Sequence, residues 1–273
     1  MATVALPRLS GVSLLAHESA PRRWVNLLGV VLFFVAWHAA SLYIADPSTL
    51  AGPVQVVSTF LGLLHEPFAG STLAGHLLTS LGRFGAGFAL SAVIGIPLGL
   101  TMASFAAVDA IVKPLFNLLR FVAPIAWVPF AILWFGTGFG GPVLIIFAGA
   151  FPACVIGSYG GARLVDGTLV EAASMLGASR LRILLEVTLP SAVPAIVSAL
   201  RIAAGNAWQS LVGAELIVAS SGIAYIMVRG QMNRTIVIVL VGMLTIGLFG
   251  LALEWVFNVI EQKIRVQLGT VSR

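Results

Sequence analysis

Long apolar runs separated by short charged segments dominate this chain. A helix needs about 20 apolar residues to cross the hydrocarbon of a bilayer, and the pattern predicts six such spans in an all-α membrane protein. The predicted spans are Trp24–Ala45, a stretch between Arg83 and Asp109, two spans in the run from Pro114 or Leu115 to Ala162, about Ser191–Ala219, and about Thr235–Ile260. The sequence from Gly136 to Pro142 supplies the turn within the long run. Pro53–Leu64 is expected to form a short helix on the membrane surface.

The composition agrees with a chain whose solvent is lipid. Hydrophobic residues make up 59% of the sequence and charged residues only 9%, against about 25% charged residues in soluble domains. We therefore expect one membrane domain over residues 24–265, with a cytoplasmic N-terminal segment at 1–23 and a cytoplasmic tail at 266–273. Cys154 lies in an apolar run and is expected to be a small buried side chain.

The positive charges predict the orientation of the spans. The chain has 15 Lys and Arg residues and a net charge of +5. They are scattered through the loops between apolar runs, which is the topology signal of a membrane protein and argues against nucleic-acid binding. With the N-terminus inside, ten of the 15 are inside, Arg229 and Arg234 are outside, and Arg83, Arg120 and Arg201 are in spans or at their edges. Both termini are therefore predicted to be cytoplasmic.

The longest interior loop, at about residues 163–190, has a helical pattern. Thr168 and Glu171 have the spacing of a capping box, which predicts the start of a helix. Gly177 is expected to end or bend that helix, and a second short helical stretch leads to Pro190 in the first turn of the next span. The loop is thus predicted to be a small-residue helix–turn–helix at the cytoplasmic face.

The same loop resembles the EAA loop of binding-protein-dependent ABC importer permeases. That pattern is Glu-Ala-Ala, three residues, Gly, nine residues, and Ile-x-Leu-Pro, and this chain departs from it only at Val187. In that family the loop forms a coupling helix that docks into a groove of the ATPase subunit. The resemblance implies an ATPase-coupling set, of which the first four residues form the contact itself: Glu171, Ala172, Ala173, Gly177, Leu189 and Pro190.

Further stretches resemble the nitrate, sulfonate, taurine and bicarbonate subgroup, over about residues 75–265. They are Thr79–Arg83, Pro124–Pro129, Trp134–Gly136, Leu200–Arg201 and Ala214–Ile217. The form of Trp134–Gly136 favours a taurine or alkanesulfonate cargo; nitrate, bicarbonate, an aromatic acid or a pyrimidine stay open as alternatives. The resemblance implies two ATPase subunits, a second permease copy forming a homodimer, and an extracytoplasmic binding protein.

The chain carries no site for ATP hydrolysis of its own. A P-loop needs Gly-x-x-x-x-Gly-Lys-Ser/Thr, and neither Lys113 nor Lys263 stands in one. A partner must then supply the ATPase, whereas a channel or an ion-coupled transporter would need none. The four histidines show no ligand spacing, and we expect neither a metal site nor a cofactor.

Charged residues within spans are candidates for function because they are costly in hydrocarbon. At about 100° per residue, one stripe of the fifth span carries Arg201, Gly205, Trp208, Val212 and Glu215. One hypothesis is that this stripe lines the translocation path and that Arg201 attracts an anion. The alternative is that Arg201 reaches the cytoplasmic edge while Glu215 binds a neighbouring helix. Arg83 is expected near the outer edge as a structural residue, and Gly95-x-x-x-Gly99 predicts close helix packing.

Overall fold

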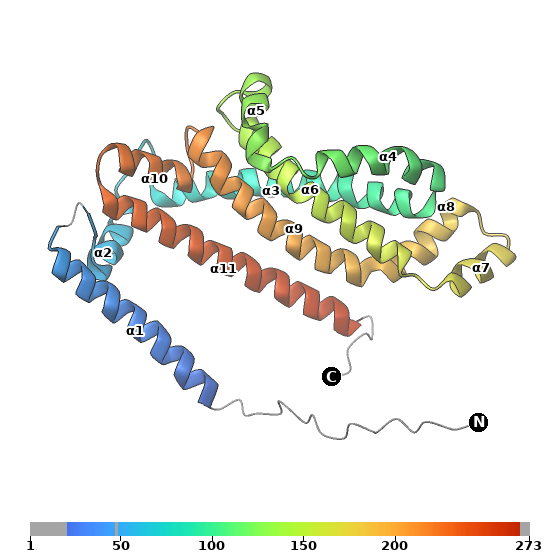
Figure 1. Cartoon of the computed structure of the whole chain (residues 1–273), viewed down its shortest axis with the longest axis horizontal. Helices are drawn as coiled ribbons and strands as arrows, with labels where there is room; N and C mark the ends of the chain where they lie inside the picture. The colour runs from blue at the N-terminus through green and yellow to red at the C-terminus, as the bar shows by residue number, and fades with distance from the viewer. Residues whose placement is uncertain (1–20, 47–48, 268–273) are drawn as a thin grey trace, which may run out of the picture.

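A computed structural model of the chain describes residues 21–46 and 49–267, and these residues form an elongated helical bundle (Figure 1). Five of the described helices or continuous helical runs are long and apolar enough to cross a membrane. The long helices are α1 (Pro21–Ile44), α3 (Leu73–Ser104), α6 (Gly140–Arg163), α9 (Leu189–Ile217) and α11 (Ile236–Gln267). They correspond to the predicted first, second, fourth, fifth and sixth spans. The predicted segment 1–23 and tail 266–273 lie largely outside the described residues.

The predicted third span is broken, which corrects the expectation of a continuous helix. It consists of α4 (Ala106–Leu119), a 3-10 turn η1 (Pro124–Trp127) and α5 (Val128–Phe135), with a bend of 90°. Ala123 precedes Pro124 and has a φ of -57° and a ψ of 141°. The backbone is extended at this residue because a proline ring disfavours helical geometry in the residue before it. Arg120 consequently caps the end of α4 instead of lying inside a helix. The described part of the chain has six spans only if the bent pair is counted as one.

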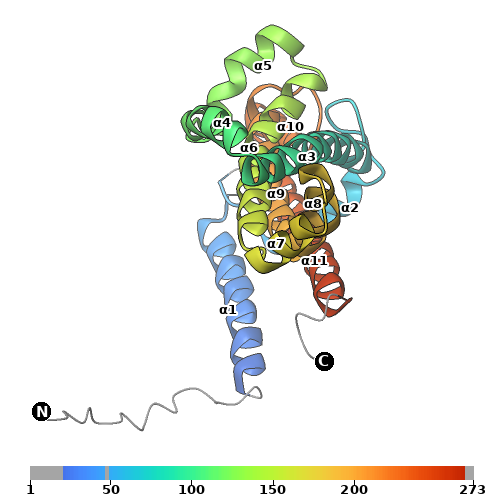
Figure 2. The same cartoon turned by 90° about the vertical axis from the view of Figure 1, so that its right-hand side faces the viewer.

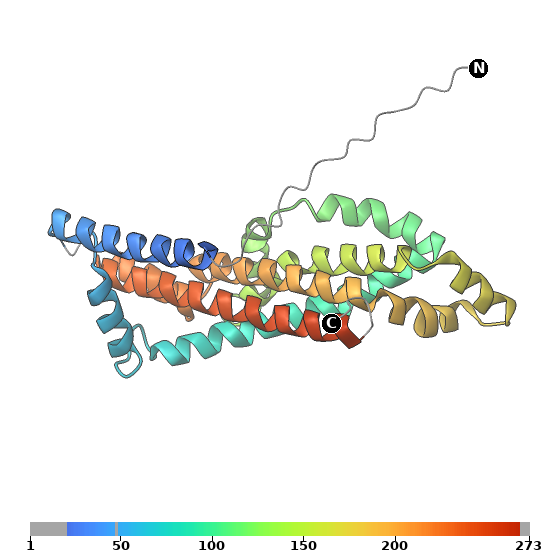
Figure 3. The ribbon, with the colours of Figure 1, turned by 90° about the horizontal axis from the view of Figure 1, so that it is seen from below.

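Short helices occupy the connections between the long ones. α2 (Pro53–Leu63) matches the predicted helix at Pro53–Leu64, whereas α10 (Ile223–Met232) was not predicted. Both lie at one end of the bundle, and α7 (Gly167–Met175) and α8 (Arg180–Ile183) lie at the opposite end (Figure 3). The view along the bundle shows α7 and α8 in front of α9, with α1 standing to one side (Figure 2).

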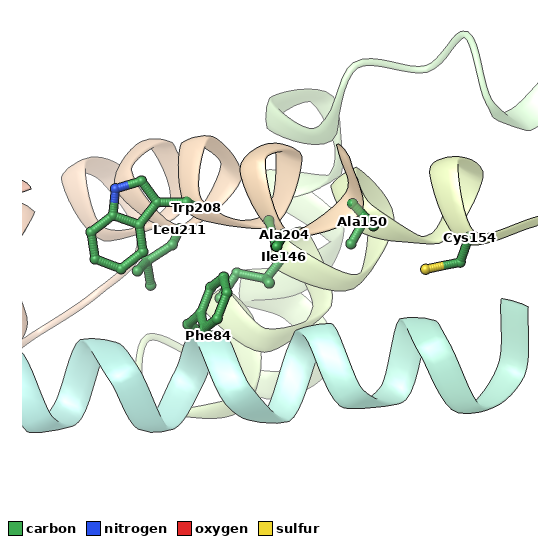
Figure 4. Packing of buried hydrophobic residues seen from close by; sticks show 9 residues of the cluster. Phe84, Ile146, Ala150, Cys154, Ala204, Trp208 and Leu211 are labelled. Carbon is green, nitrogen blue, oxygen red and sulfur yellow. The ribbon is translucent and has the colours of Figure 1, made fainter. Parts of the chain in front are cut away.

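The core is formed where α3, α6 and α9 pack side by side. Its largest cluster joins Phe84 of α3, Ile146 and Cys154 of α6, and Trp208 and Leu211 of α9 (Figure 4). Cys154 is a buried free cysteine, as expected. The helices approach closely because small residues face each other: a Cβ atom at Gly95 would lie 2.8 Å from the Cβ of Cys154. The predicted close packing at Gly95-x-x-x-Gly99 is therefore confirmed.

Replacing Gly99 with leucine is expected to destabilise the bundle. A Cβ there would lie 2.9 Å from the backbone nitrogen of Tyr159, so the added side chain would push α3 and α6 apart. Overpacking of this kind costs about 1–3 kcal/mol. Thermal unfolding of the purified protein in detergent measures the cost, with Gly85→Leu on the same helix as control because no heavy atom lies within 4 Å of that position. Equal melting temperatures for the two variants would contradict this packing.

Candidate functional site

The 163–190 loop projects from one end of the bundle as two short helices, α7 and α8 (Figure 1). From Arg180 the chain is helical without interruption through α8, a π-helical turn η2 (Leu184–Thr188) and α9. Leu184 is buried against Leu100, Ala192 and Ile196, with Leu189 packed beside them. The second half of the loop, from Arg180, thus continues α9 and is anchored to the core.

The start of α7 differs from the predicted capping box. Asp166 is the N-cap, and its Oδ1 accepts a hydrogen bond of 2.9 Å from the backbone N–H of Thr168, which lies inside the helix. This bond lowers the pKa of the Asp166 carboxyl below its ordinary value, because the donated N–H favours the charged form. Asp166 removes the need for Thr168 as a cap. The side chain of Glu171 is therefore left exposed on α7.

Gly177 ends the helix, as the sequence predicts. Its φ is +79°, in the left-handed region that glycine adopts without the steric penalty of a side chain. The N–H of Ala178 donates to the carbonyl of Ala173 at 3.1 Å, a bond typical of a glycine C-cap. Ser179 then caps α8 by accepting from the N–H of Arg182 at 3.3 Å. The serine after a glycine turn is the signal by which the start of α8 could have been found.

The surface of the loop is uncovered and carries both charged and apolar side chains. No residue of α7 or α8 is buried. The most exposed apolar side chains are Leu164, Met175 and Leu176, at 85%, 85% and 89%. Exposed apolar side chains gathered in one region are a common feature of protein–protein contact sites.

The six residues of the predicted coupling set fall into two groups. Glu171, Ala172 and Gly177 are exposed on α7 and its end, with Ala173 half-buried among them. Leu189 and Pro190 lie instead at the start of α9. There Leu189 packs into the core while Pro190 is exposed. The first group is available to a partner, and Leu189 anchors the loop.

The predicted stripe of α9 does not share one environment. Arg201 forms ion pairs with Glu254 and Glu261 of α11, the second at 3.3 Å. Trp208 is buried and donates from Nε1 to the carbonyl of Ile246 on α11 at 3.3 Å. Gly205 is exposed and Val212 half-buried. Arg201 and Trp208 thus bind α11, and Glu215 also binds a neighbouring helix.

Glu215 and Arg83 form a buried ion pair between α9 and α3. The side chains of Arg83 and Glu215 are 2% and 1% exposed, and Nη1 of Arg83 lies 3.0 Å from Oε1 of Glu215. Arg83 also donates to the carbonyl oxygens of Ser221 at 2.6 Å and Gly138 at 3.3 Å. Because α3 starts at Leu73, Arg83 lies about three turns inside the helix. Its contacts agree with the structural role expected for Arg83.

The same pair organises the connection from α9 to α10. Oε2 of Glu215 accepts from the N–H of Ala224 at 3.1 Å, and Ser80 donates to Oε1 at 2.7 Å. Gly222 passes over the carboxylate with a φ of +118°, where a side chain would collide with Glu215. Its N–H donates to Nδ1 of His76 at 3.1 Å. The network therefore fixes α3, α9 and α10 at the end opposite to α7.

A cavity of about 390 Å³ lies beside α9, near the bend between α4 and α5. Two of its polar residues, Asn206 and Gln209, are exposed and were missed by the sequence reasoning. They carry no charge, so the rule that flags ions in spans passes over them. The signal that could have found them is an uncharged amide pair in the middle of an apolar helix.

Comparison with known proteins places the chain in a family. Residues 95–266 match the family of the binding-protein-dependent transport system inner membrane component. A putative ABC transporter permease protein of Methanocaldococcus jannaschii is 35% identical over 85% of this chain and 87% of its own length. The taurine transport system permease protein TauC of Escherichia coli is 32% identical over 89% of this chain and 88% of its own length. The nitrate import permease protein NrtB of Synechocystis is 28% identical over 83% of this chain and 84% of its own length.

The fold has a counterpart among solved structures. An inward-facing structure of the MetNI methionine ABC transporter superposes with a TM-score of 0.59 at 18% identity, covering 70% of this chain and 95% of that one. The family match over residues 95–266 covers the exposed α7 loop and the whole of α9. The chain therefore belongs to the binding-protein-dependent permeases: it is the multi-pass inner-membrane subunit of an ABC importer, in which a separate subunit hydrolyses ATP.

Proposed function

We propose that this permease moves a small anionic solute, favoured to be taurine or another alkanesulfonate, across the inner membrane by alternating access. The observation that carries the coupling part of the proposal is the exposed helix α7, with its Glu-Ala-Ala sequence and its glycine cap. The cargo class is supported by the similarity to TauC. Nitrate is the alternative that the similarity to NrtB supports, and bicarbonate, an aromatic acid and a pyrimidine are tested beside it.

In this proposal two copies of the chain pair in the membrane, each with six spans when α4 and α5 count as one. Both termini and α7 face the cytoplasm, where the positive charges are concentrated. An extracytoplasmic binding protein delivers the solute to the opposite end. Closure of the two ATPase subunits on ATP draws the two α7 helices together and shifts the permease toward its outward-open state.

Reconstitution in liposomes tests this function. The permease, its ATPase and its binding protein are expected to take up labelled taurine only when ATP is present on the α7 side, and an ionophore that collapses ion gradients should leave uptake unchanged. Excess unlabelled nitrate, bicarbonate, aromatic acid or pyrimidine identifies the cargo by competition. Uptake that follows an ion gradient without the ATPase would instead indicate a self-sufficient secondary transporter.

A further inference from the structure

Two uncharged amide side chains stand exposed in the middle of α9 (Leu189–Ile217). At about 1.5 Å per residue, Asn206 lies roughly 25 Å from the start of the helix and roughly 16 Å from its end. Within the described residues, neither the side chain of Asn206 nor that of Gln209 has a hydrogen-bond partner. An unsatisfied polar group in hydrocarbon is costly. This face of α9 is therefore suited to water or protein and not to lipid.

The two amides border the cavity beside α9. Its wall includes Ser210 and Gly213 of α9, Gly149 of α6 and Pro124 at the start of η1. The chain at the 90° bend between α4 and α5 forms the wall of the cavity that faces α9. At Gly213 a Cβ atom would have only the tip of Ile125, at 4.0 Å, as neighbour. A small solute fits here beside the amides.

Two of the three arginines predicted within or at the edge of spans are neutralised by carboxylates. Arg201 is paired with two carboxylates, Glu254 and Glu261. Arg83 is buried in its pair with Glu215. The polar side chains that line the cavity, Asn206, Gln209 and Ser210, are uncharged. Such donors bind an anion weakly, which suits a path from which the solute has to leave again.

We infer that Asn206 and Gln209 are solute-contacting residues, whose amide N–H groups donate to the oxygen atoms of an oxyanion such as a sulfonate as it crosses the membrane. The inference rests on the proposed function of anion import and names the residues that touch the cargo. The same face of the second copy would close the cavity from the other side. An anion is then passed between uncharged donors and not held by a fixed cation.

Exchange of the amide for a carboxylate of equal size tests this inference. Gln209→Glu replaces the amide donor with a negative charge on a side chain of the same length. Because this charge repels an anion, uptake by the complete reconstituted transporter is expected to fall about tenfold or more. Asn206→Asp is expected to act in the same way. Gln262→Glu is the matched control, because Gln262 is exposed on α11 and does not line the cavity. Copurification of the ATPase and the size of the complex report assembly.

The outcomes separate this inference from the proposed function. Loss of uptake in Gln209→Glu and Asn206→Asp, with assembly intact and Gln262→Glu normal, supports solute contact. Normal uptake in both cavity variants overturns the inference while leaving the import function in place. Loss of assembly in both also overturns it, because the amides would then join the two copies. If the unaltered complex takes up no anion with ATP, the proposed function fails and the inference with it.

Discussion

Replacing Glu171 with lysine and Gly177 with tryptophan in one variant is expected to release the ATPase from the permease. Glu171 is an exposed carboxylate on α7, and lysine reverses its charge. Gly177 has a φ of +79°, so a tryptophan there strains the end of α7 as well as adding bulk. A reduction of about tenfold or more in copurified ATPase corresponds to about 1.4 kcal/mol of lost binding free energy. Affinity purification of the tagged permease from membranes measures it.

The matched control applies the same two changes at the opposite end of the bundle. Glu66 is exposed there, and Gly70 has a φ of +95° with no heavy atom within 4 Å. Glu66→Lys with Gly70→Trp should retain the ATPase while carrying an equal change of charge and a similar backbone strain. If both variants keep the ATPase, or both lose it although they insert in the membrane, α7 is not the docking element. The ATPase would then have to dock on another part of the permease.

Removing one partner of the Arg83–Glu215 pair is expected to produce the largest loss of stability. Either Arg83→Leu or Glu215→Leu leaves the other charge buried without compensation, which typically costs about 3–5 kcal/mol. Arg83→Leu also leaves the carbonyl oxygens of Ser221 and Gly138 without their donor. For a domain of this size the melting temperature should fall by roughly 10 °C. Thermal unfolding followed by tryptophan fluorescence in detergent measures the change.

A second ion pair on the same helix serves as the control. The side chains of Arg201 and Glu254 are 36% and 48% exposed, and pairs exposed to this degree contribute at most about 1 kcal/mol. Glu254→Gln should therefore lower the melting temperature by no more than a few degrees. The double variant Arg83→Leu with Glu215→Leu should be more stable than either single variant, because no buried charge remains. Single variants as stable as Glu254→Gln would show that the buried pair does not hold α3 to α9.

Local chemistry in the sequence predicted most of the helices. Five of the six predicted spans are continuous helices, because an apolar run of sufficient length leaves the backbone no partners except its own in lipid. The end of α7 at Gly177 was predicted because only glycine adopts the left-handed conformation freely. The start of α7 was predicted with the wrong cap. Asp166 and Thr168 both have oxygen atoms that can cap a helix, and the sequence alone did not choose between them.

The broken third span shows where the apolar pattern is insufficient. The segment from Ala106 to Phe135 is apolar enough to cross a membrane when its two helices are taken together, but Pro124 and Pro129 divide its second part into a 3-10 turn and a short helix. Hydropathy does not record the missing backbone donors or the restriction on Ala123. The prolines were visible in the sequence, and their effect on the direction of the chain is what the structure adds.

The partners of charged and polar residues depended on the tertiary structure. The sequence by itself determined a multi-span helical protein, a capped loop with the spacing of a coupling motif, and the lack of a P-loop, because these depend on residues close together in the chain. Only the folded bundle brought Arg83 to Glu215, 132 residues apart, and Arg201 to Glu254. Helical periodicity assigns a side chain to a face, but which helix covers that face is decided by packing. For the same reason only the structure places Asn206 and Gln209 beside a cavity.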